Sequence, residues 1–280
     1  MTMNISDTRI AILGTGNIGS AIARGLVSAG LLPAGRISLT RRKPEGLSDF
    51  KRDGYLVGTD NAEALRNADL VVLAVTPQQL NTLLSEIKGV LDPRRHIVVS
   101  VVSGATIAEI RRQLGGEPAI IRAMPNTAIA IRESMTCLST DNGDARALAL
   151  VKTIFDSLGK SLVIEEGLMV PATALCACGI AFFLRSIRAA SQGGIEIGFH
   201  AEEALLMAAQ TARGAASLLA EAGNHPEREV DKVTTPQGCT IAGLNQMEHY
   251  GFSSALIRGI VTSAEKAAVL YAPKEKRTES

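Results

Sequence analysis

The sequence predicts an α/β fold, in which a doubly wound parallel sheet is followed by an all-α C-terminal domain. Short β-branched apolar runs alternate with helical patterns in the first part of the chain, as in buried parallel strands joined by right-handed crossovers. Past about residue 165 only Ala- and Leu-rich helical patterns follow. In a chain of 280 residues we therefore expect two domains, over residues 1–165 and 166–280.

The first strand and turn predict a dinucleotide site. An apolar run that follows Arg9 leads into a Gly-x-Gly-x-x-Gly motif, formed by Gly14, Thr15, Gly16, Asn17, Ile18 and Gly19. The first glycine permits a tight turn, the second lets backbone N–H groups approach a pyrophosphate, and the third lets the helix pack on the strand. The following helix then directs its unpaired N–H groups at the phosphates. This context favours a Rossmann-type domain over an ordinary glycine-rich turn.

The second strand predicts which dinucleotide binds. It is expected at residues 37–40 and ends in Thr40, Arg41 and Arg42. An NAD site usually has an acid here to accept from the ribose 2′-hydroxyl, but this segment has none before Glu45. Thr40 can donate a hydrogen bond, and guanidinium groups suit a 2′-phosphate. We therefore expect NADPH as the cofactor, with NADH secondary, rather than a solvated basic turn.

The remaining elements continue the alternation. After a helical stretch to residue 53, we expect strands at 55–58, 69–75, 96–102, 119–124, 135–138 and 162–164, and helices at 78–88, 106–114 and 144–158. Thr106 and Glu109 have the spacing of a capping box. The second domain is expected to contain helices at 169–191, 201–222, 240–250 and 252–271.

Composition limits the partners and the compartment. The 29 basic and 28 acidic residues nearly balance and Trp is absent, which argues against a nucleic-acid partner. The first residues lack the pattern of a secretory signal, and the apolar run at 170–184 is shorter than the ~20 residues of a membrane span. We therefore expect a buried helix there and no membrane partner. The four cysteines form no CxxC pair and the four histidines have no metal-ligand spacing, so we expect reduced thiols, a cytoplasmic protein and no metal.

The helical domain predicts self-association. Residues 201–222 are apolar on more than one face, through Ala204, Leu205, Ala208, Ala209, Ala212, Ala215, Ala216 and Leu219. Such a helix needs a partner beyond one layer, which favours a dimer or higher homo-oligomer over a self-contained bundle.

One loop of the helical domain predicts an anion site. It contains Thr235, Gly238, Cys239 and Thr240, and the helix is expected to begin at Thr240. Backbone N–H groups at a helix N-terminus form a cradle for a carboxylate, and the threonines add hydroxyls. A capped helix without a ligand is the alternative.

Several motifs together resemble one family. They are Gly-Thr-Gly-Asn-Ile at 14–18, Ala-Val-Thr-Pro-Gln at 74–78, Ser-Gly-Ala-Thr at 103–106, Met-Pro-Asn-Thr at 124–127, and the loop at 234–244. Over nearly its full length the chain resembles pyrroline-5-carboxylate reductase. The resemblance implies a Rossmann domain, a helical domain that interlocks with a second subunit, and an active site at the dimer interface.

The resemblance also implies roles for residues. It assigns to the cofactor Gly14 to Gly19, Thr40, Arg41, Arg42, Asn61, Ala74, Val75, Thr76, Pro77, Ser103, Gly104, Met124, Pro125 and Asn126. Thr235, Gly238, Cys239 and Thr240 would hold the substrate carboxylate, with Glu166 and Thr173 contributed by the partner subunit. Hydride would pass from NADPH to the C=N carbon of a small cyclic imine and give proline, with the Thr240 hydroxyl orienting the ring nitrogen.

Three departures from the family pattern leave alternatives open. Thr76 replaces a lysine, Gln237 replaces a glycine, and residues 176–182 replace Ser-Gly-Ser-Gly-Pro-Ala-Tyr by Cys-Ala-Cys-Gly-Ile-Ala-Phe. Because the last segment lies near the family's substrate pocket, a different cyclic imine acid is an alternative substrate. A non-catalytic NADP-binding protein is a further alternative, against which the retained Gly-Cys-Thr cradle argues.

Overall fold

The computed structural model describes residues 5–141 and 144–269. These form two compact units, one containing the described residues up to 178 and from 263 onward, the other containing residues 179–262. The domain boundary between residues 165 and 166 remains a prediction.

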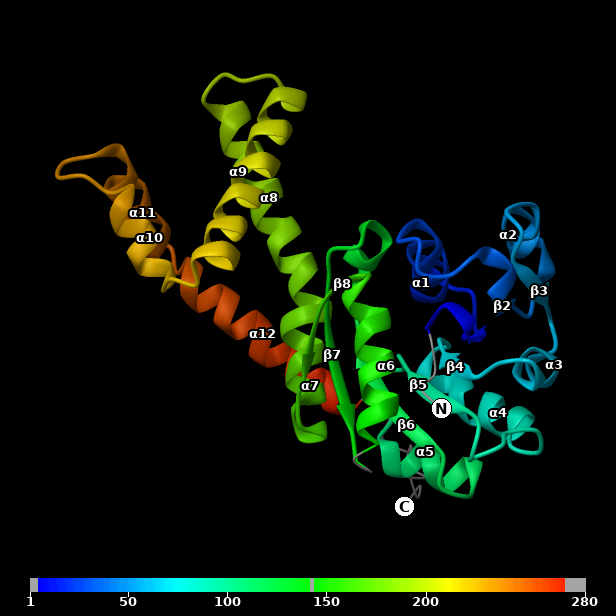
Figure 1. The fold of residues 1–280 in the computed structure, drawn as a ribbon. Helices are drawn as coiled ribbons and strands as arrows, with labels where there is room; N and C mark the ends of the chain where they lie inside the picture. The colour runs from blue at the N-terminus through cyan, green and yellow to red at the C-terminus, as the bar shows by residue number, and fades with distance from the viewer. Residues whose placement is uncertain (1–4, 142–143, 270–280) are drawn as a thin grey trace, which may run out of the picture. The chain divides into compact units, whose positions relative to one another are not determined.

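The first unit contains one sheet of eight strands (Figure 1). The strands are β1 (Ile10–Leu13), β2 (Ile37–Thr40), β3 (Leu56–Gly58), β4 (Leu70–Leu73), β5 (Ile97–Ser100), β6 (Ala119–Met124), β7 (Ser134–Thr140) and β8 (Gly159–Val163). Their order is β3-β2-β1-β4-β5-β6-β7-β8. The order reverses between β1 and β4, the position at which doubly wound sheets bind ligands. The predicted fold class is confirmed.

One pair of strands departs from the parallel arrangement that the alternating pattern predicts. β6 and β7 are antiparallel, with Met124 opposite Cys137. A parallel pair needs a crossover of about a dozen or more residues, usually a helix. Residues 125–133 hold instead a short 3₁₀ turn, η4 (Thr127–Ile131), so the chain returns directly and reverses direction.

Helices cover both faces of the sheet. In the first unit they are α1 (Asn17–Ser28), α2 (Ser48–Arg52), α3 (Asn61–Arg66), α4 (Pro77–Ile87), α5 (Ile107–Leu114), α6 (Ala145–Asp156) and α7 (Met169–Ala172), with a π-helical segment at Thr173–Cys178. On β1, Ile10 and Ile12 join one core cluster, and Ala11 and Leu13 join the other. This alternation is the period-two pattern of a strand buried on both sides.

Local signals explain several helix starts. The capping box of Thr106 and Glu109 is present at the start of α5, as predicted. α3 was not predicted; it begins after Asp60, whose carboxylate accepts from Glu63 N at 3.0 Å. Six residues are too few to show a clear helical period, so only this N-cap marked the helix.

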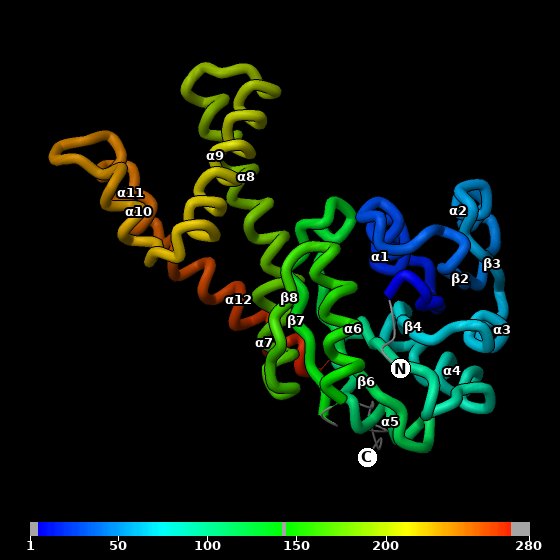
Figure 2. Tube along the Cα trace, viewed as in Figure 1, coloured from blue at the N-terminus to red at the C-terminus, as the bar shows by residue number. Residues whose placement is uncertain are grey.

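The second unit is helical. It contains α8 (Gly179–Glu196), α9 (Ala201–Ala222), α10 (Pro226–Lys232), α11 (Cys239–His249) and the first part of α12 (Phe252–Ala268). α8 and α9 lie side by side (Figures 1 and 2), and a Cβ on Gly194 would lie 3.0 Å from the Ala204 Cβ. α10 was not predicted, and the expected end of α12 at residue 271 lies outside the described residues.

The helix expected to be buried at 170–184 is buried only in part: Ala172, Thr173, Ala174 and Gly179 are buried in the single chain, whereas the end of the run is exposed. Phe183 is 60% exposed and Leu184 is 59% exposed. The expectation therefore fails at the end of the run, where these side chains find few partners within one copy of the chain. Within the described ranges, one helical run, Glu166–Glu196, is long and apolar enough to cross a membrane by length and composition alone, which is weak evidence for a span.

Candidate functional site

The glycine motif forms the turn between β1 and α1, and steric contacts explain two of its glycines. Gly14 has φ +105°, and a Cβ there would lie 2.5 Å from the Ala74 carbonyl oxygen. A Cβ on Gly19 would lie 2.1 Å from the Gly14 oxygen. A Cβ on Gly16 would meet no described atom within 4 Å. Gly16 therefore leaves open space beside the backbone, as a pyrophosphate requires.

The N-terminus of α1 suits an anion. Gly16 is its N-cap, and within the described residues no side chain caps the helix, so its first N–H groups remain for a ligand. The Thr40 carbonyl oxygen accepts from Gly14 N at 3.2 Å, from Thr15 N at 3.0 Å and from Thr15 Oγ1 at 2.9 Å. These bonds fix the turn against the end of β2.

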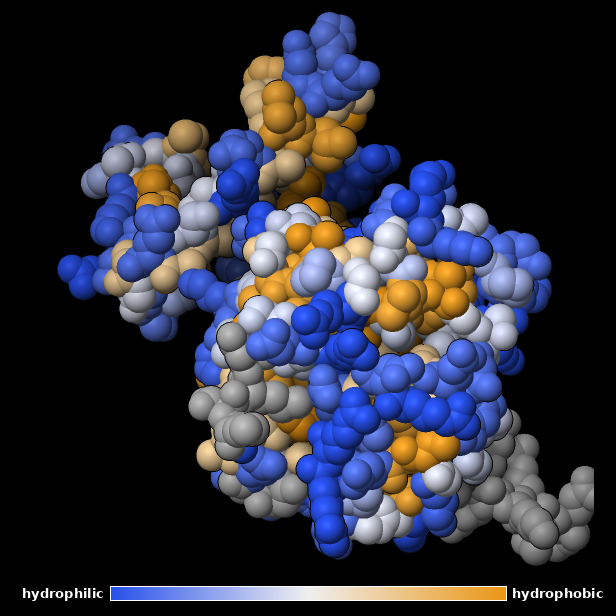
Figure 3. Space-filling view, turned by 45° about the vertical axis from the view of Figure 1, so that its right-hand side comes forward, coloured by the Kyte–Doolittle hydropathy of each residue, from blue (hydrophilic) through white to orange (hydrophobic). Residues whose placement is uncertain are grey.

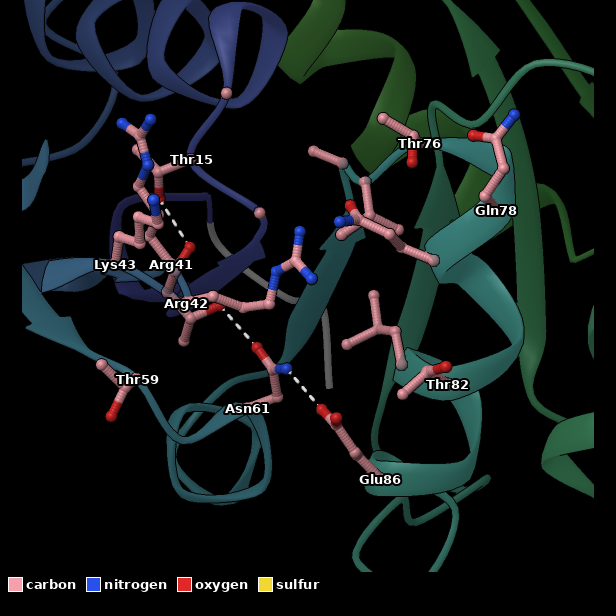
Figure 4. A pocket seen from close by; sticks show the side chains of 17 residues that line it. Thr15, Arg41, Arg42, Lys43, Thr59, Asn61, Thr76, Gln78, Thr82 and Glu86 are labelled. Carbon is pink, nitrogen blue, oxygen red and sulfur yellow. Dashed lines mark hydrogen bonds between the residues drawn. The ribbon is translucent and has the colours of Figure 1, made fainter.

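A cavity of about 800 Å³ opens at this edge of the sheet (Figure 4). Predicted cofactor residues that line it are Gly14, Thr15, Gly16, Thr40, Arg41, Arg42, Asn61, Ala74, Val75 and Thr76. Those that do not are Asn17, Ile18, Gly19, Pro77, Ser103, Gly104, Met124, Pro125 and Asn126. The volume lies within the usual range for cofactor sites, and the open turn, the uncapped helix and the cations together fit a phosphorylated dinucleotide.

Several lining residues were not predicted. They are Lys43, Thr59, Gln78, Gln79, Thr82, Leu83 and Glu86. Lys43 continues the basic run at the end of β2, and the last five follow a spacing of three or four along α4. That spacing defines one helix face, so helical periodicity could have identified them.

A chain of hydrogen bonds joins three residues that line the cavity. Thr40 Oγ1 donates to Asn61 Oδ1 at 2.6 Å, and Asn61 Nδ2 donates to Glu86 Oε2 at 2.6 Å. Figure 4 shows Asn61 between the end of β2 and Glu86 on α4. The Thr40 hydroxyl, expected to donate to the cofactor, directs its proton to Asn61 in this arrangement.

The Met-Pro-Asn-Thr segment contacts the start of the long helical run. Asn126 Nδ2 donates to the Cys176 carbonyl oxygen at 3.2 Å, and Asn126 Oδ1 accepts from Ala128 N at 3.0 Å. Met124 belongs to a small buried cluster with Cys137 and Met169, against which Cys176 packs. These contacts tie β6 and β7 to the π-helical segment.

Two thiols interact in this cluster. The hydrogen bond between Cys137 and Cys176 lowers the pKa of Cys176 to about 7, while the same bond, with burial, raises the pKa of Cys137. The Cys176 thiol loses its proton more easily because the Cys137 thiol then donates a hydrogen bond to the thiolate. Both cysteines are free of disulfides.

The two residues expected from the partner subunit make contacts within their own chain. Glu166 Oε1 accepts from Ile107 N at 2.7 Å and from Arg122 Nη1 at 3.1 Å. The Arg122 side chain is 3% exposed and that of Glu166 is 29% exposed. Thr173 is buried and its hydroxyl donates to the Met169 carbonyl oxygen at 2.8 Å. Both therefore have structural partners, whether or not they also meet a substrate.

The predicted carboxylate loop lies in the helical unit. Its helix, α11, begins at Cys239 with Gly238 as N-cap, so the expected start at Thr240 was one residue late. Within the described residues no side chain caps this helix, and its first N–H groups remain for an anion. Gln237, where the family has glycine, has φ +59°, a left-handed conformation that glycine adopts more easily. Thr240 is half-buried.

A nucleotide-sized cavity at the switch point of a doubly wound sheet, with an open glycine turn and an uncapped helix N-terminus, defines a dinucleotide-dependent oxidoreductase. Family models agree: residues 9–104 match the family described as NADP oxidoreductase coenzyme F420-dependent, and residues 166–270 match pyrroline-5-carboxylate reductase dimerisation. The chain belongs to the pyrroline-5-carboxylate reductase family, as its relatives establish.

Two relatives come from Dictyostelium discoideum. Pyrroline-5-carboxylate reductase 2 is 47% identical over 97% of this chain and 96% of its own length. Pyrroline-5-carboxylate reductase 1 is 54% identical over 98% of this chain, which spans about half (52%) of that relative. A solved pyrroline-5-carboxylate reductase from Coxiella burnetii is 29% identical, with a TM-score of 0.87, covering 95% of this chain and 99% of that one. The resemblance predicted from the motifs is confirmed.

Proposed function

We propose that this chain reduces the C=N bond of 1-pyrroline-5-carboxylate to give L-proline, the last step of proline biosynthesis, with NADPH preferred over NADH. The observation that carries the proposal is one cavity, whose lining includes both Gly16, the N-cap of the uncapped helix α1, and the basic residues Arg41, Arg42 and Lys43. Backbone amides suit the pyrophosphate, and the three cations suit a 2′-phosphate. The choice of substrate follows from the relatives, which are named pyrroline-5-carboxylate reductases.

The protein's part in the reaction is to position the substrate and to polarise its C=N bond. When bound, the reduced cofactor supplies the hydride. The N–H groups of Cys239 and Thr240 hold the substrate carboxylate, and the Thr240 hydroxyl orients the ring nitrogen. A protonated imine is already a good electrophile, so the site needs no strong acid–base pair.

The test is a turnover assay with both cofactors and several imines. Purified protein should reduce 1-pyrroline-5-carboxylate with a higher kcat/KM for NADPH than for NADH. A preference for NADH would contradict the cofactor assignment. Absence of turnover with every imine, together with nucleotide binding, would favour the non-catalytic alternative.

The same assay addresses the alternative imines. The segment at 176–182 departs from the family pattern, and its Cys176 carbonyl oxygen accepts from Asn126. A six-membered imine acid or a pyrroline 2-carboxylate should therefore be included. A kcat/KM for either that exceeds the value for 1-pyrroline-5-carboxylate would reassign the substrate.

We further propose a homo-oligomer joined through the helical unit. Of residues 179–262, all of them described, the buried ones are Gly179, Ser191 and Ala204. Figure 3 displays apolar surface over α8 and α9, where Leu206 is 71% exposed. A helical unit with almost no core of its own needs a partner to bury this surface, which supports an obligate dimer or larger assembly. Light scattering of a folded, active monomer at micromolar concentration would contradict this.

A cytoplasmic location is part of the proposal. All four cysteines are free, and a reducing compartment keeps thiols in that form. Microscopy of a tagged protein that finds it in a secretory or membrane compartment would contradict this.

A further inference from the structure

One acidic side chain lies in a cavity that is otherwise suited to phosphate. Glu86 projects from α4 into the lining that also contains Arg41, Arg42 and Lys43. The sequence pattern that favoured NADPH, the absence of an acid at the end of β2, did not include this carboxylate. The fold supplies it from α4 instead.

Glu86 determines how the amide of Asn61 is oriented. An ionised carboxylate only accepts hydrogen bonds, so the Asn61 NH₂ group must face Glu86, as it does at 2.6 Å. The Asn61 oxygen then faces Thr40 and takes the hydroxyl proton, also at 2.6 Å. The Thr40 oxygen is left with lone pairs for any further partner. A ribose 2′-hydroxyl can donate to such an oxygen, whereas a phosphate cannot.

We propose that Glu86 is a selectivity-determining positioning residue that weakens the preference for the 2′-phosphate and allows the site to accept NAD(H). Two effects act in the same direction. Its negative charge opposes a phosphate dianion held by the neighbouring cations, and through Asn61 it withdraws the Thr40 proton from that phosphate. The inference rests on the proposed assignment of the cavity to the cofactor.

The test compares nucleotide affinities without any imine. Glu86→Gln keeps the shape of the side chain and removes the charge, and a glutamine can either donate to or accept from Asn61. Calorimetry with NADP⁺ and NAD⁺ on the full chain should show the affinity ratio for NADP⁺ over NAD⁺ rising by roughly three- to tenfold, the range of one hydrogen bond. Glu63→Gln is the matched control, because this exposed acid lies on α3 and does not line the cavity. It should leave the ratio unchanged.

A second variant separates the two effects. In an Asn61→Ala background the relay to Thr40 is gone, so Glu86→Gln should raise the ratio less than it does in the parent. The rise in the affinity ratio that remains in this background is due to the charge of Glu86. Raising the salt concentration from about 0.05 to 0.5 M should make that rise smaller, because salt screens the charge. Equal effects in both backgrounds would overturn the relay.

The outcomes distinguish this inference from the proposed reaction. If Glu86→Gln leaves the affinity ratio unchanged or lowers it while the parent binds both nucleotides, the role of Glu86 is refuted. If the parent binds nucleotides and Glu86→Gln raises the ratio, the inference holds even when no imine is reduced, and only the proposed reaction fails. If the parent binds neither nucleotide, the cavity assignment and the inference fail together.

Discussion

Removing the Glu166 carboxylate should destabilise the fold more than it weakens substrate binding. In Glu166→Ala, the guanidinium of Arg122, 3% exposed, loses its partner at 3.1 Å. The Ile107 N–H, at the first turn of α5, loses its acceptor at 2.7 Å. One side chain therefore secures both a buried cation and the start of a helix.

The magnitude follows from these contacts. Losing one partner of a buried ion pair costs about 3–5 kcal/mol. The Glu166 side chain is 29% exposed, so water can reach the vacated position and solvate the guanidinium in part. An unpaired helix N–H adds about 1 kcal/mol. Because this solvation offsets part of the loss, we expect the free energy of unfolding to fall by about 2–4 kcal/mol in total.

Urea unfolding followed by circular dichroism measures this change. Parent and variant must be compared at the same protomer concentration, because self-association contributes to apparent stability. Glu165→Ala is the matched control, since this neighbouring exposed acid should change the unfolding free energy little. If Glu166→Ala unfolds like the parent while the KM for the imine rises at least tenfold, the carboxylate acts on substrate and the structural argument is refuted.

Three further outcomes follow from the site and its surroundings. Replacing Arg41 and Arg42 with Ala should raise the KM for NADPH and leave that for NADH nearly unchanged, since each lost phosphate contact costs on the order of 1.5–3 kcal/mol; steady-state kinetics measure this, and a parallel rise for NADH would contradict it. Thr240→Ala should lower kcat by roughly ten- to a thousandfold while Thr240→Ser stays within several-fold; because Gly238 is the N-cap, the Ala variant removes no cap, and full kcat in it would reject the substrate site. The hydrogen bond from Arg111 holds the pKa of Asp141 below its ordinary value of 3.8, so this pair stabilises the fold above that pH, and its contribution is lost as the pH falls through the lowered pKa. In Asp141→Asn the free energy of unfolding should therefore depend less on pH in this acid range. Unfolding titrations at several pH values measure this, and a pH dependence equal to that of the parent would contradict it.

Elements with local signals were predictable from the sequence. β2 and β6 have the predicted bounds, and each ends at a clear local signal: β2 at the basic run that begins with Arg41, and β6 at Pro125. The capping box at α5 was likewise encoded within four residues. The glycine turn was predictable because the contacts of Gly14 and Gly19 require glycine at those positions.

Features that depend on tertiary contacts were not predictable in this way. The reversal at β7 depends on the length of one connection, which the alternating pattern does not report. Thr40 and Asn61 were both predicted as cofactor residues. The direction in which the Thr40 hydroxyl donates its hydrogen bond was not predictable, because it depends on Glu86, which is distant in sequence. Glu166 was assigned to substrate by resemblance, whereas its contacts with Ile107 and Arg122 emerge only when β6, α5 and the start of the long helical run come together.

The helical unit shows why a pattern can predict a helix correctly and its burial wrongly. The apolar run that includes Phe183 and Leu184 forms a helix, yet both side chains are more than half exposed in one chain. Hydropathy indicates that burying a side chain is favourable, but it does not say which molecule buries that side chain. The same two-sided pattern on α9 predicted self-association. The exposure of these side chains and the proposed oligomer therefore rest on one feature: residues 179–262 have almost no core of their own, and a second copy of the chain would cover their apolar surface.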